Sequence, residues 1–306
     1  MSSYQHPSPF RRWRLYAFLG VLLLAAAVGI VTFLMGNGTP HLAYEYVRVG
    51  FSEERPYAYV DAEGHVTGEC PEELRVVMKR LGVDSLQWQL MEFGSLPTAL
   101  QTKRTDVIAT GMFITPQRAG TMAFSSPTLD IREACLLAPK GRFVNVRTYQ
   151  DLLRYKPLEI AVVYGAIERQ RLLRAGIPED LISSFPDVAT ALDALNRREV
   201  NCLALSNPTI AMLRNRRGFP NSRMVDTLET IHLTGERFHG YVGFAFRPSD
   251  KMTLQEVNKV LASFVGSPQH QAIMHRFGFS PSELPTERTL SEVLRSLGEP
   301  TGNQKP

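Results

Sequence analysis

The stretch Thr110–Arg118, which reads TGMFITPQR, is the part of this chain in which strand, helix start and candidate ligand residue come together. It follows Asp106–Thr110, whose apolar pattern predicts a buried strand, and Pro116 suits the first turn of a helix. In open α/β sheets, ligands bind at the carboxyl ends of strands. Arg118 offers two parallel N–H donors there. We therefore expect Arg118 to hold a ligand carboxylate, with a purely structural ion pair as the alternative.

Strands and helices alternate on both sides of this stretch. A first unit opens with the strand Val47–Phe51, followed by a hairpin around Asp61–Gly64 and a helix over Pro71–Leu81. A second unit of the same kind begins at the strand Ile160–Val163. This alternation predicts an α/β protein with mostly parallel sheets and helices on both faces.

The 306 residues divide into seven predicted segments. They are a cytoplasmic tail at 1–14, a transmembrane anchor or signal at 15–35, a linker at 36–44, a first part of lobe 1 at 45–138, lobe 2 at 139–238, a return to lobe 1 at 239–285 and a C-terminal tail at 286–306. The tail contains a short predicted helix at Leu290–Leu297, and nothing after about Pro285 is expected to be essential to a core.

The segment Leu15–Met35 is an uncharged and mostly apolar run. A helix of about 20 residues crosses a bilayer core, and Arg11, Arg12 and Arg14 precede the run. The positive-inside bias keeps these arginines in the cytoplasm and places the rest of the chain outside. We expect an uncleaved anchor and a location in the periplasm or on the extracytoplasmic face, with a cleaved secretory signal as the alternative.

The net charge of +4 follows from 34 basic and 30 acidic side chains. Three of the excess positive charges are the arginines before the apolar run, so the rest of the chain is near neutral. A nucleic-acid partner would need a basic face on the folded part, and we expect none.

The remaining chemistry of the sequence is sparse. There is no GxSxG, P-loop, GxGxxG or HExxH motif, so we expect no catalytic residue, metal or cofactor. Of the three cysteines, Cys135 and Cys202 lie in apolar strand-like runs and are expected to be small buried side chains, with a Cys70–Cys135 disulfide as an alternative.

Several motifs together resemble the family-3 extracellular solute-binding proteins of ABC importers. They are the VRVGF strand, Phe93–Leu96, the GM-x-IT-x-x-R turn and Phe124–Pro127. The resemblance runs from Val47 to Phe279. It implies a two-lobed type II periplasmic-binding-protein clamp with a hinge between the lobes, and a monomer that delivers its ligand to an ABC permease. In that family the arginine of the turn, here Arg118, holds the ligand carboxylate.

Two departures from the family pattern narrow the ligand. Members that bind ordinary α-amino acids usually have Ser or Thr where this chain has Phe113, and an acid where it has Ala204–Pro208. Without that acid, the three N–H donors of a primary ammonium group would lack a carboxylate acceptor. A plain amino acid is therefore less favoured than another small zwitterion.

Three aromatic residues, Tyr57, Phe93 and Phe113, stand at cleft positions of the family, next to Glu54. Aromatic faces attract delocalised cations. With Arg118, this set resembles the subgroup that binds ectoine and hydroxyectoine, which are cyclic amidinium carboxylates. Core packing is the alternative for each ring.

In lobe 2, Gly165-Ala166 stands where relatives commonly have Gly-Thr, so a hydroxyl contact to the ligand is lost. The backbone N–H groups at the start of the following helix are expected to bind a ligand carboxylate there instead. The complete predicted ligand site is Glu54, Tyr57, Phe93, Gly111, Phe113, Thr115, Arg118, Gly165, Ala166, Ser206 and Asn207.

Three alternatives stay open. One is a binding protein for an amino acid or another polar solute. The second is an enzyme resembling cyclohexadienyl dehydratases, with Glu54 as the one candidate general acid. The third is a sensor that signals through a partner chain.

Overall fold

The computed structural model describes residues 45–131, 134–139, 141–143, 145–146, 148–214, 222–225 and 240–298. The predicted tail, anchor and linker at 1–44 lie outside these residues. Within the described part of the chain, no helix is long and apolar enough to cross a membrane.

The elements up to the second sheet are β1 (Val47–Phe51), β2 (Tyr59–Val60), β3 (Val66–Thr67), α2 (Glu69–Arg80), β4 (Leu86–Leu90), η1 (Phe93–Ser95), α3 (Leu96–Gln101), β5 (Val107–Ile108), α4 (Pro116–Ala119), β6 (Ala123–Phe124) and β7 (Leu129–Ile131). The second sheet and its helices are β8 (Ala134–Pro139), η2 (Tyr149–Arg154), β9 (Ile160–Val163), α5 (Ile167–Arg174), η3 (Glu179–Leu181), β10 (Ile182–Phe185), α6 (Val188–Asn196), β11 (Cys202–Ser206), α7 (Asn207–Arg214) and β12 (Ser222–Val225). The chain then continues through β13 (Gly240–Val242), β14 (Ala245–Phe246), α8 (Lys251–Phe264), α9 (Pro268–Arg276), η4 (Pro281–Glu283) and α10 (Leu290–Gly298).

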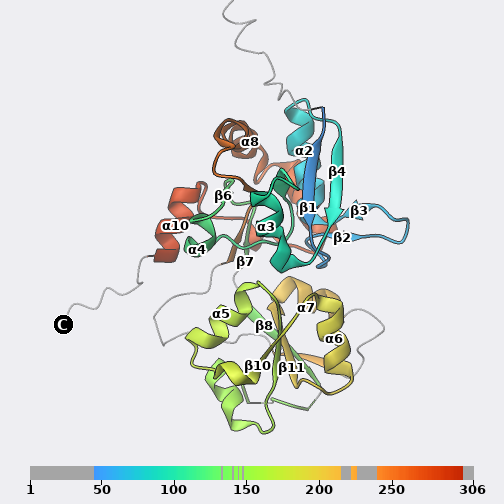
Figure 1. Cartoon of the computed structure of the whole chain (residues 1–306), viewed down its shortest axis with the longest axis vertical. Coiled ribbons are helices and arrows are strands. Elements are labelled where there is room, and N and C mark those ends of the chain that lie inside the picture. Colours follow the sequence, from blue (N-terminus) through green and yellow to red (C-terminus); the bar gives the residue numbers. More distant parts are fainter. Residues whose placement is uncertain are drawn as a thin grey trace, which may run out of the picture. The chain divides into compact units, whose positions relative to one another are not determined.

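Lobe 1 is built on a five-stranded sheet of order β4-β1-β5-β14-β6, drawn in blue to orange in Figure 1. Neighbouring residues of β5 show its two-sided burial: Val107 joins the apolar cluster formed with α2 and α8, and Ile108 joins the one formed with α3. Adjacent side chains of a strand point to opposite faces, so helices cover both faces of this sheet.

Lobe 2 is built on a second five-stranded sheet, of order β10-β9-β11-β8-β12. The strand β9 is buried at all four residues, as expected for a central strand with apolar side chains on both faces. In both lobes the carboxyl ends of the parallel strands carry the loops described below.

The prediction of mostly parallel sheets is right for only one side of each sheet, the side that starts at the edge strand β4 in lobe 1 and at the edge strand β10 in lobe 2. The strand β1 pairs parallel to β4 and β5, whereas β14 pairs antiparallel to β5 and β6. In lobe 2, β9 pairs parallel to β10 and β11, whereas β8 pairs antiparallel to β11 and β12. The antiparallel strands β8 and β14 each follow the chain's passage from one sheet to the other.

One predicted boundary needs correction. We expected lobe 1 to extend to residue 138, but β8 lies in the sheet of lobe 2. Its apolar sequence suits either sheet, and only the pairing with β11 decides its place. The chain leaves lobe 1 after β7 and returns to it at β13. These two strands pair antiparallel, with Ile131 opposite Gly240, and so mark the lobe-1 end of both connections. The other segment boundaries stay predictions.

Two local predictions are refined by the structure. The helix α2 begins two residues before the predicted start, at Glu69, with Gly68 as its N-cap residue at φ 121°, so Pro71 stands in its first turn. The predicted C-terminal tail contains α10, and Val293 of that helix is fully buried. The expectation that nothing after Pro285 is essential to a core was therefore wrong.

The thiols of Cys70 and Cys202 are free and buried, so the Cys70–Cys135 disulfide is not formed. The side chain of Cys135 lies outside the described part. Among the described residues, no group of three or more His, Cys, Asp or Glu side chains is placed to hold a metal ion.

Candidate functional site

The loop between β1 and β2 carries Glu54 and Tyr57. It is closed by two backbone hydrogen bonds between Glu54 and Ala58, of 2.8 and 3.0 Å. The start of α2 supports it from behind, because the backbone N–H of Cys70 donates to the Tyr57 carbonyl at 3.0 Å. The Tyr57 ring also lies directly against Gly111, where a Cβ atom would come within 2.6 Å of it. A glycine is therefore required at position 111.

The Thr110–Arg118 turn is held by two contacts to the rest of lobe 1 and by one hydrogen bond within the turn. The backbone N–H of Ile114 donates to the Tyr241 carbonyl at 2.7 Å, and Phe113 forms a β-bridge with Val242. The hydroxyl of Thr115 caps α4 by accepting from the backbone N–H of Arg118 at 3.1 Å. Thr115 thus fixes the turn without lining the cavity.

The Arg118 guanidinium reaches from this turn to lobe 2. It donates to the Phe113 carbonyl at 2.6 Å and to the Gly165 carbonyl at 2.9 Å, and it lies 5.4 Å from the centre of the Phe93 ring. Removal from solvent lowers the pKa of Arg118 to about 10, against the attraction of Glu168. Arg118 is therefore a cation at neutral pH.

Lobe 2 approaches lobe 1 through the loop after β9. Gly165 has φ of 80°, and a Cβ atom there would lie 2.8 Å from the Cα of Gly94 in lobe 1. A Cβ on Gly94 would lie 2.3 Å from the ring of Tyr164. This close approach depends on both glycines. Ala166 is the N-cap residue of α5, which presents Glu168 and, one turn later, Arg171.

A chain of hydroxyl groups joins the lobes on the other side of the cavity. The Tyr57 hydroxyl donates to Ser206 at 3.0 Å, Ser206 and Thr209 are hydrogen-bonded at 3.1 Å, and Thr209 donates to Glu54 at 2.7 Å. Since Tyr57 and Thr209 are the donors at the two ends, the Ser206 hydroxyl donates to Thr209. Asn207 opens α7 beside this chain but does not line the cavity.

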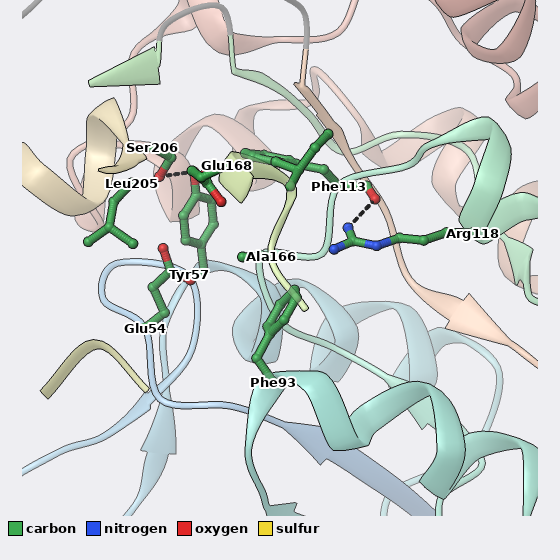
Figure 2. Close-up of a pocket in the computed structure, with 11 residues that line it drawn as sticks. Glu54, Tyr57, Phe93, Phe113, Arg118, Ala166, Glu168, Leu205 and Ser206 are labelled. Atoms are coloured by element: carbon green, nitrogen blue, oxygen red, sulfur yellow. Dashed lines mark hydrogen bonds between the residues drawn. The ribbon is translucent and has the colours of Figure 1, made fainter. Parts of the chain in front are cut away.

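These elements enclose a small inner cavity (Figure 2). It is lined by Glu54, Tyr57, Phe93, Gly111, Phe113, Arg118, Ala166, Ile167, Glu168, Leu205 and Ser206. Its volume of about 10 Å³ has room for about one water molecule. A solute of several heavy atoms therefore requires the lobes to move apart before it enters.

The structure brings eight of the eleven predicted site residues to this cavity. Thr115, Gly165 and Asn207 lie next to it instead, and the ligand contacts of all eleven stay a prediction. Sequence reasoning missed Glu168, Arg171 and Thr209. An acid in the first turn of a helix usually compensates the helix dipole, so Glu168 carried no separate signal.

Burial sets the electrostatics of the site. Burial raises the pKa of Glu54 to about 7, the Thr209 hydrogen bond opposes this rise, and the neighbouring Glu168 adds to it. Burial also raises the pKa of Glu168, against Arg171 and Arg118. Burial lowers the pKa of Arg171 to about 10, and its guanidinium lies 5.5 Å from the centre of the Phe113 ring. The site thus places two carboxyl groups, of Glu54 and Glu168, and two guanidinium groups, of Arg118 and Arg171, near the aromatic rings.

A second, outer cavity of about 350 Å³ shares Glu54 with the inner one. Its walls come from the loop after β1, the end of β4 and the helices α6 and α7. The acidic residues Glu53, Glu92 and Asp187 line it together with Leu90, Val188 and Leu192. The volume is that of a small-molecule pocket, and its walls combine acidic and apolar groups with one basic residue, Arg55.

Residues 47–280 match the family model of bacterial extracellular solute-binding proteins, family 3. The chain belongs to that family, and its two lobes have the type II periplasmic-binding fold.

Individual relatives lie within the same family. A probable amino-acid ABC transporter periplasmic-binding protein of Sinorhizobium fredii, y4tE, is 25% identical over 281 residues, which cover 90% of each chain. A probable histidine-binding protein of Neisseria gonorrhoeae is 23% identical over 228 residues, which cover 74% of this chain and 80% of that one.

Two solved structures are similar in fold and sequence. The structure of EhuB in complex with hydroxyectoine is 27% identical, with a TM-score of 0.70, and the match covers 77% of this chain and 89% of EhuB. The P235GK mutant of ArgBP from T. maritima is 25% identical, with a TM-score of 0.66, covering 76% and 95% of the two chains.

Proposed function

We propose that this protein is the substrate-binding component of an ABC importer and captures a small zwitterion outside the cytoplasmic membrane. Ectoine or hydroxyectoine is the first candidate ligand. The observation that carries the proposal is one cavity that gathers Arg118, Glu54 and the rings of Tyr57, Phe93 and Phe113.

The two ends of a zwitterion need opposite partners, and the cavity offers both. Arg118 is cationic and its guanidinium now donates to two backbone carbonyls, which a ligand carboxylate would replace with charge-assisted bonds. Glu54 and the aromatic faces would take the cation, each face contributing about 0.5–2 kcal/mol.

Closure of the two lobes is the second part of the proposal. Hydrogen bonds from Arg118 to Gly165 and from Tyr57 to Ser206 cross from one lobe to the other. A ligand would enter with the lobes apart and be enclosed when they meet, with the hinge beside the β7–β13 pair. The closed form would then dock on a permease.

The comparison with EhuB supports ectoine and hydroxyectoine, since hydroxyectoine is the ligand in that structure. The y4tE protein supports ABC transport.

Binding of an amino acid or another polar solute is the second candidate. The outer cavity favours it, because about 350 Å³ beside Glu54 leaves space for a long cationic side chain among Glu53, Glu92 and Asp187. The one base of this lining, Arg55, is held by the Val60 carbonyl and the Tyr59 ring. The histidine-binding relative and ArgBP are in keeping with such a ligand.

A dehydratase activity is a third candidate, carried by one observation. The pKa of Glu54 is raised to about 7 by burial, which suits a general acid at neutral pH. Incubation of the full chain with prephenate or arogenate would show turnover under this hypothesis. We expect none, and we expect no cofactor.

The N-terminal run Leu15–Met35 would tether the protein to the cytoplasmic membrane, facing the periplasm or the cell exterior. A monomer with no nucleic-acid partner is expected. A sensor role through a partner chain is the alternative to transport, and neighbouring genes for a permease and an ATPase would favour transport.

Calorimetry on the full chain in a mild detergent tests the proposed function. Ectoine, hydroxyectoine, L-arginine and L-histidine are titrated separately. We expect saturable one-to-one binding of ectoine or hydroxyectoine. Tighter binding of L-arginine or L-histidine would select the second candidate, and no heat with any of them at millimolar concentration would contradict zwitterion capture.

A further inference from the structure

Lobe 2 contributes an acid to the inner cavity that the family pattern of the sequence does not indicate. The stretch Ala204–Pro208 lacks the acid expected there, yet Glu168 lines the cavity from a different element, α5. Its side chain is only 4% exposed. A buried carboxylate is costly unless charges or hydrogen bonds balance it, and here the nearby Arg171 and Arg118 attract its charge.

Glu168 lies beside two arginines and also lines the inner cavity. Figure 2 shows its carboxylate directed toward the middle of the site, across from Glu54 of lobe 1. The two acids are close enough for Glu168 to raise the pKa of Glu54. Arg171, one helical turn after Glu168, balances its charge and covers one face of the Phe113 ring.

We propose that Glu168 is the lobe-2 acceptor for the ligand's cation, so that one cation donates N–H bonds to Glu54 of lobe 1 and to Glu168 of lobe 2. This inference rests on the proposed function and adds a specificity rule to it. Because the two carboxylates belong to different lobes, both bonds form only when the lobes close around the ligand.

The geometry selects a planar cation with N–H groups on opposite edges. In the proposed arrangement the faces of such a cation would lie against the Phe93 and Phe113 rings that line the cavity, and its edges would reach the two carboxylates. Amidinium and guanidinium ions have this shape. A quaternary ammonium has no N–H group and would satisfy neither Glu54 nor Glu168.

The test compares ectoine with glycine betaine, a quaternary ammonium, on the full chain by calorimetry. E168Q keeps the size of the side chain and removes its charge. We expect E168Q to weaken ectoine binding by about tenfold or more, and to change glycine betaine binding by less than about twofold. E199Q, at an exposed acid of lobe 2, is the matched control and should bind ectoine like the wild type.

The other outcomes of these titrations overturn either the role of Glu168 or the proposed function. Wild-type affinity of E168Q for ectoine, while R118A loses binding, overturns this inference alone. Equal losses for ectoine and glycine betaine assign Glu168 a structural role and also overturn it. A folded wild type that binds no zwitterion overturns the proposed function as well.

If E168Q does not fold, as judged by its melting temperature, E168D replaces it. This variant keeps the charge and withdraws it by one methylene. We expect about threefold or greater weakening for ectoine and little change for glycine betaine. Unchanged ectoine binding would overturn the inference.

Discussion

The two walls of the candidate site are held in different ways. The lobe-1 wall is fixed by contacts inside lobe 1, such as the Thr115 cap and the bond from Ile114 to Tyr241. The lobe-2 wall meets the site through bonds that cross between lobes, from Arg118 to Gly165 and from Thr209 to Glu54. Lobe 1 therefore presents a preformed half-site, and lobe 2 completes it on closing.

The largest effect is expected for Arg118→Ala. The change removes the only cation of the preformed wall among the cavity-lining residues that the structure describes, and a buried ligand carboxylate would lose its partner. We expect a loss of about 2–5 kcal/mol of binding free energy, measured by calorimetry with ectoine. Arg118→Lys keeps the charge and should recover part of the loss. Binding that survives the alanine change would remove Arg118 from the site.

Gly94→Ala is expected to have the second largest effect on ligand affinity, because it hinders closure of the lobes. The new Cβ would lie 2.3 Å from the Tyr164 ring, so the lobes would be kept apart. Overpacking of this kind costs about 1–3 kcal/mol, which should appear as weaker ligand binding, with the melting temperature of the ligand-free protein unchanged. Gly120→Ala is the control, because its nearest neighbour would lie at 3.4 Å. Equal affinity of both variants would show that this contact does not form on closure.

The pH dependence of ectoine binding tests the role of Glu54 in the lobe-1 wall. Below its pKa of about 7, the carboxyl is protonated and neutral and attracts a cation less. The affinity for ectoine should therefore fall about tenfold from pH 8 to pH 6, whereas the lower pKa of an ordinary glutamate would leave it flat over this range. Glu54→Gln should bind weakly at both pH values. A flat profile for the wild type would contradict the raised pKa of Glu54.

The smallest effect is expected for Thr115→Ala in the preformed wall. Loss of the N-cap bond to Arg118 should lower the free energy of unfolding by about 0.5–2 kcal/mol, measured by denaturant titration. Affinity should fall only a few-fold, since the other contacts of the turn remain. Thr115→Ser keeps the hydroxyl and should behave like the wild type. A loss of affinity as large as that of Arg118→Ala would mean that Thr115 contacts the ligand directly.

The lobe-1 wall and the lobe-2 wall also differ in how far the sequence predicts them. The Thr110–Arg118 turn is predictable, because its strand end, helix start and arginine lie within nine residues. The same holds for the hairpin around Asp61–Gly64, whose turn is closed by Asp61 and His65. Short-range patterns carry this information in the residues themselves.

The lobe-2 wall depends on pairings between distant segments. Thr209 reaches Glu54 across 155 positions of the chain, and β8 joins its sheet through β11. Neither follows from local periodicity. Glu168 looks like any acid at a helix start until the fold brings it to Arg118 and Glu54.

The most direct test of zwitterion capture is a crystal structure of the full chain with the tightest-binding solute from the calorimetric panel. We expect the ligand in the inner cavity, its carboxylate about 2.7–2.9 Å from the Arg118 guanidinium, and its cation between Glu54 and the aromatic rings. A ligand bound only in the outer cavity, with Arg118 still donating to Phe113 and Gly165, would contradict zwitterion capture in the inner cavity.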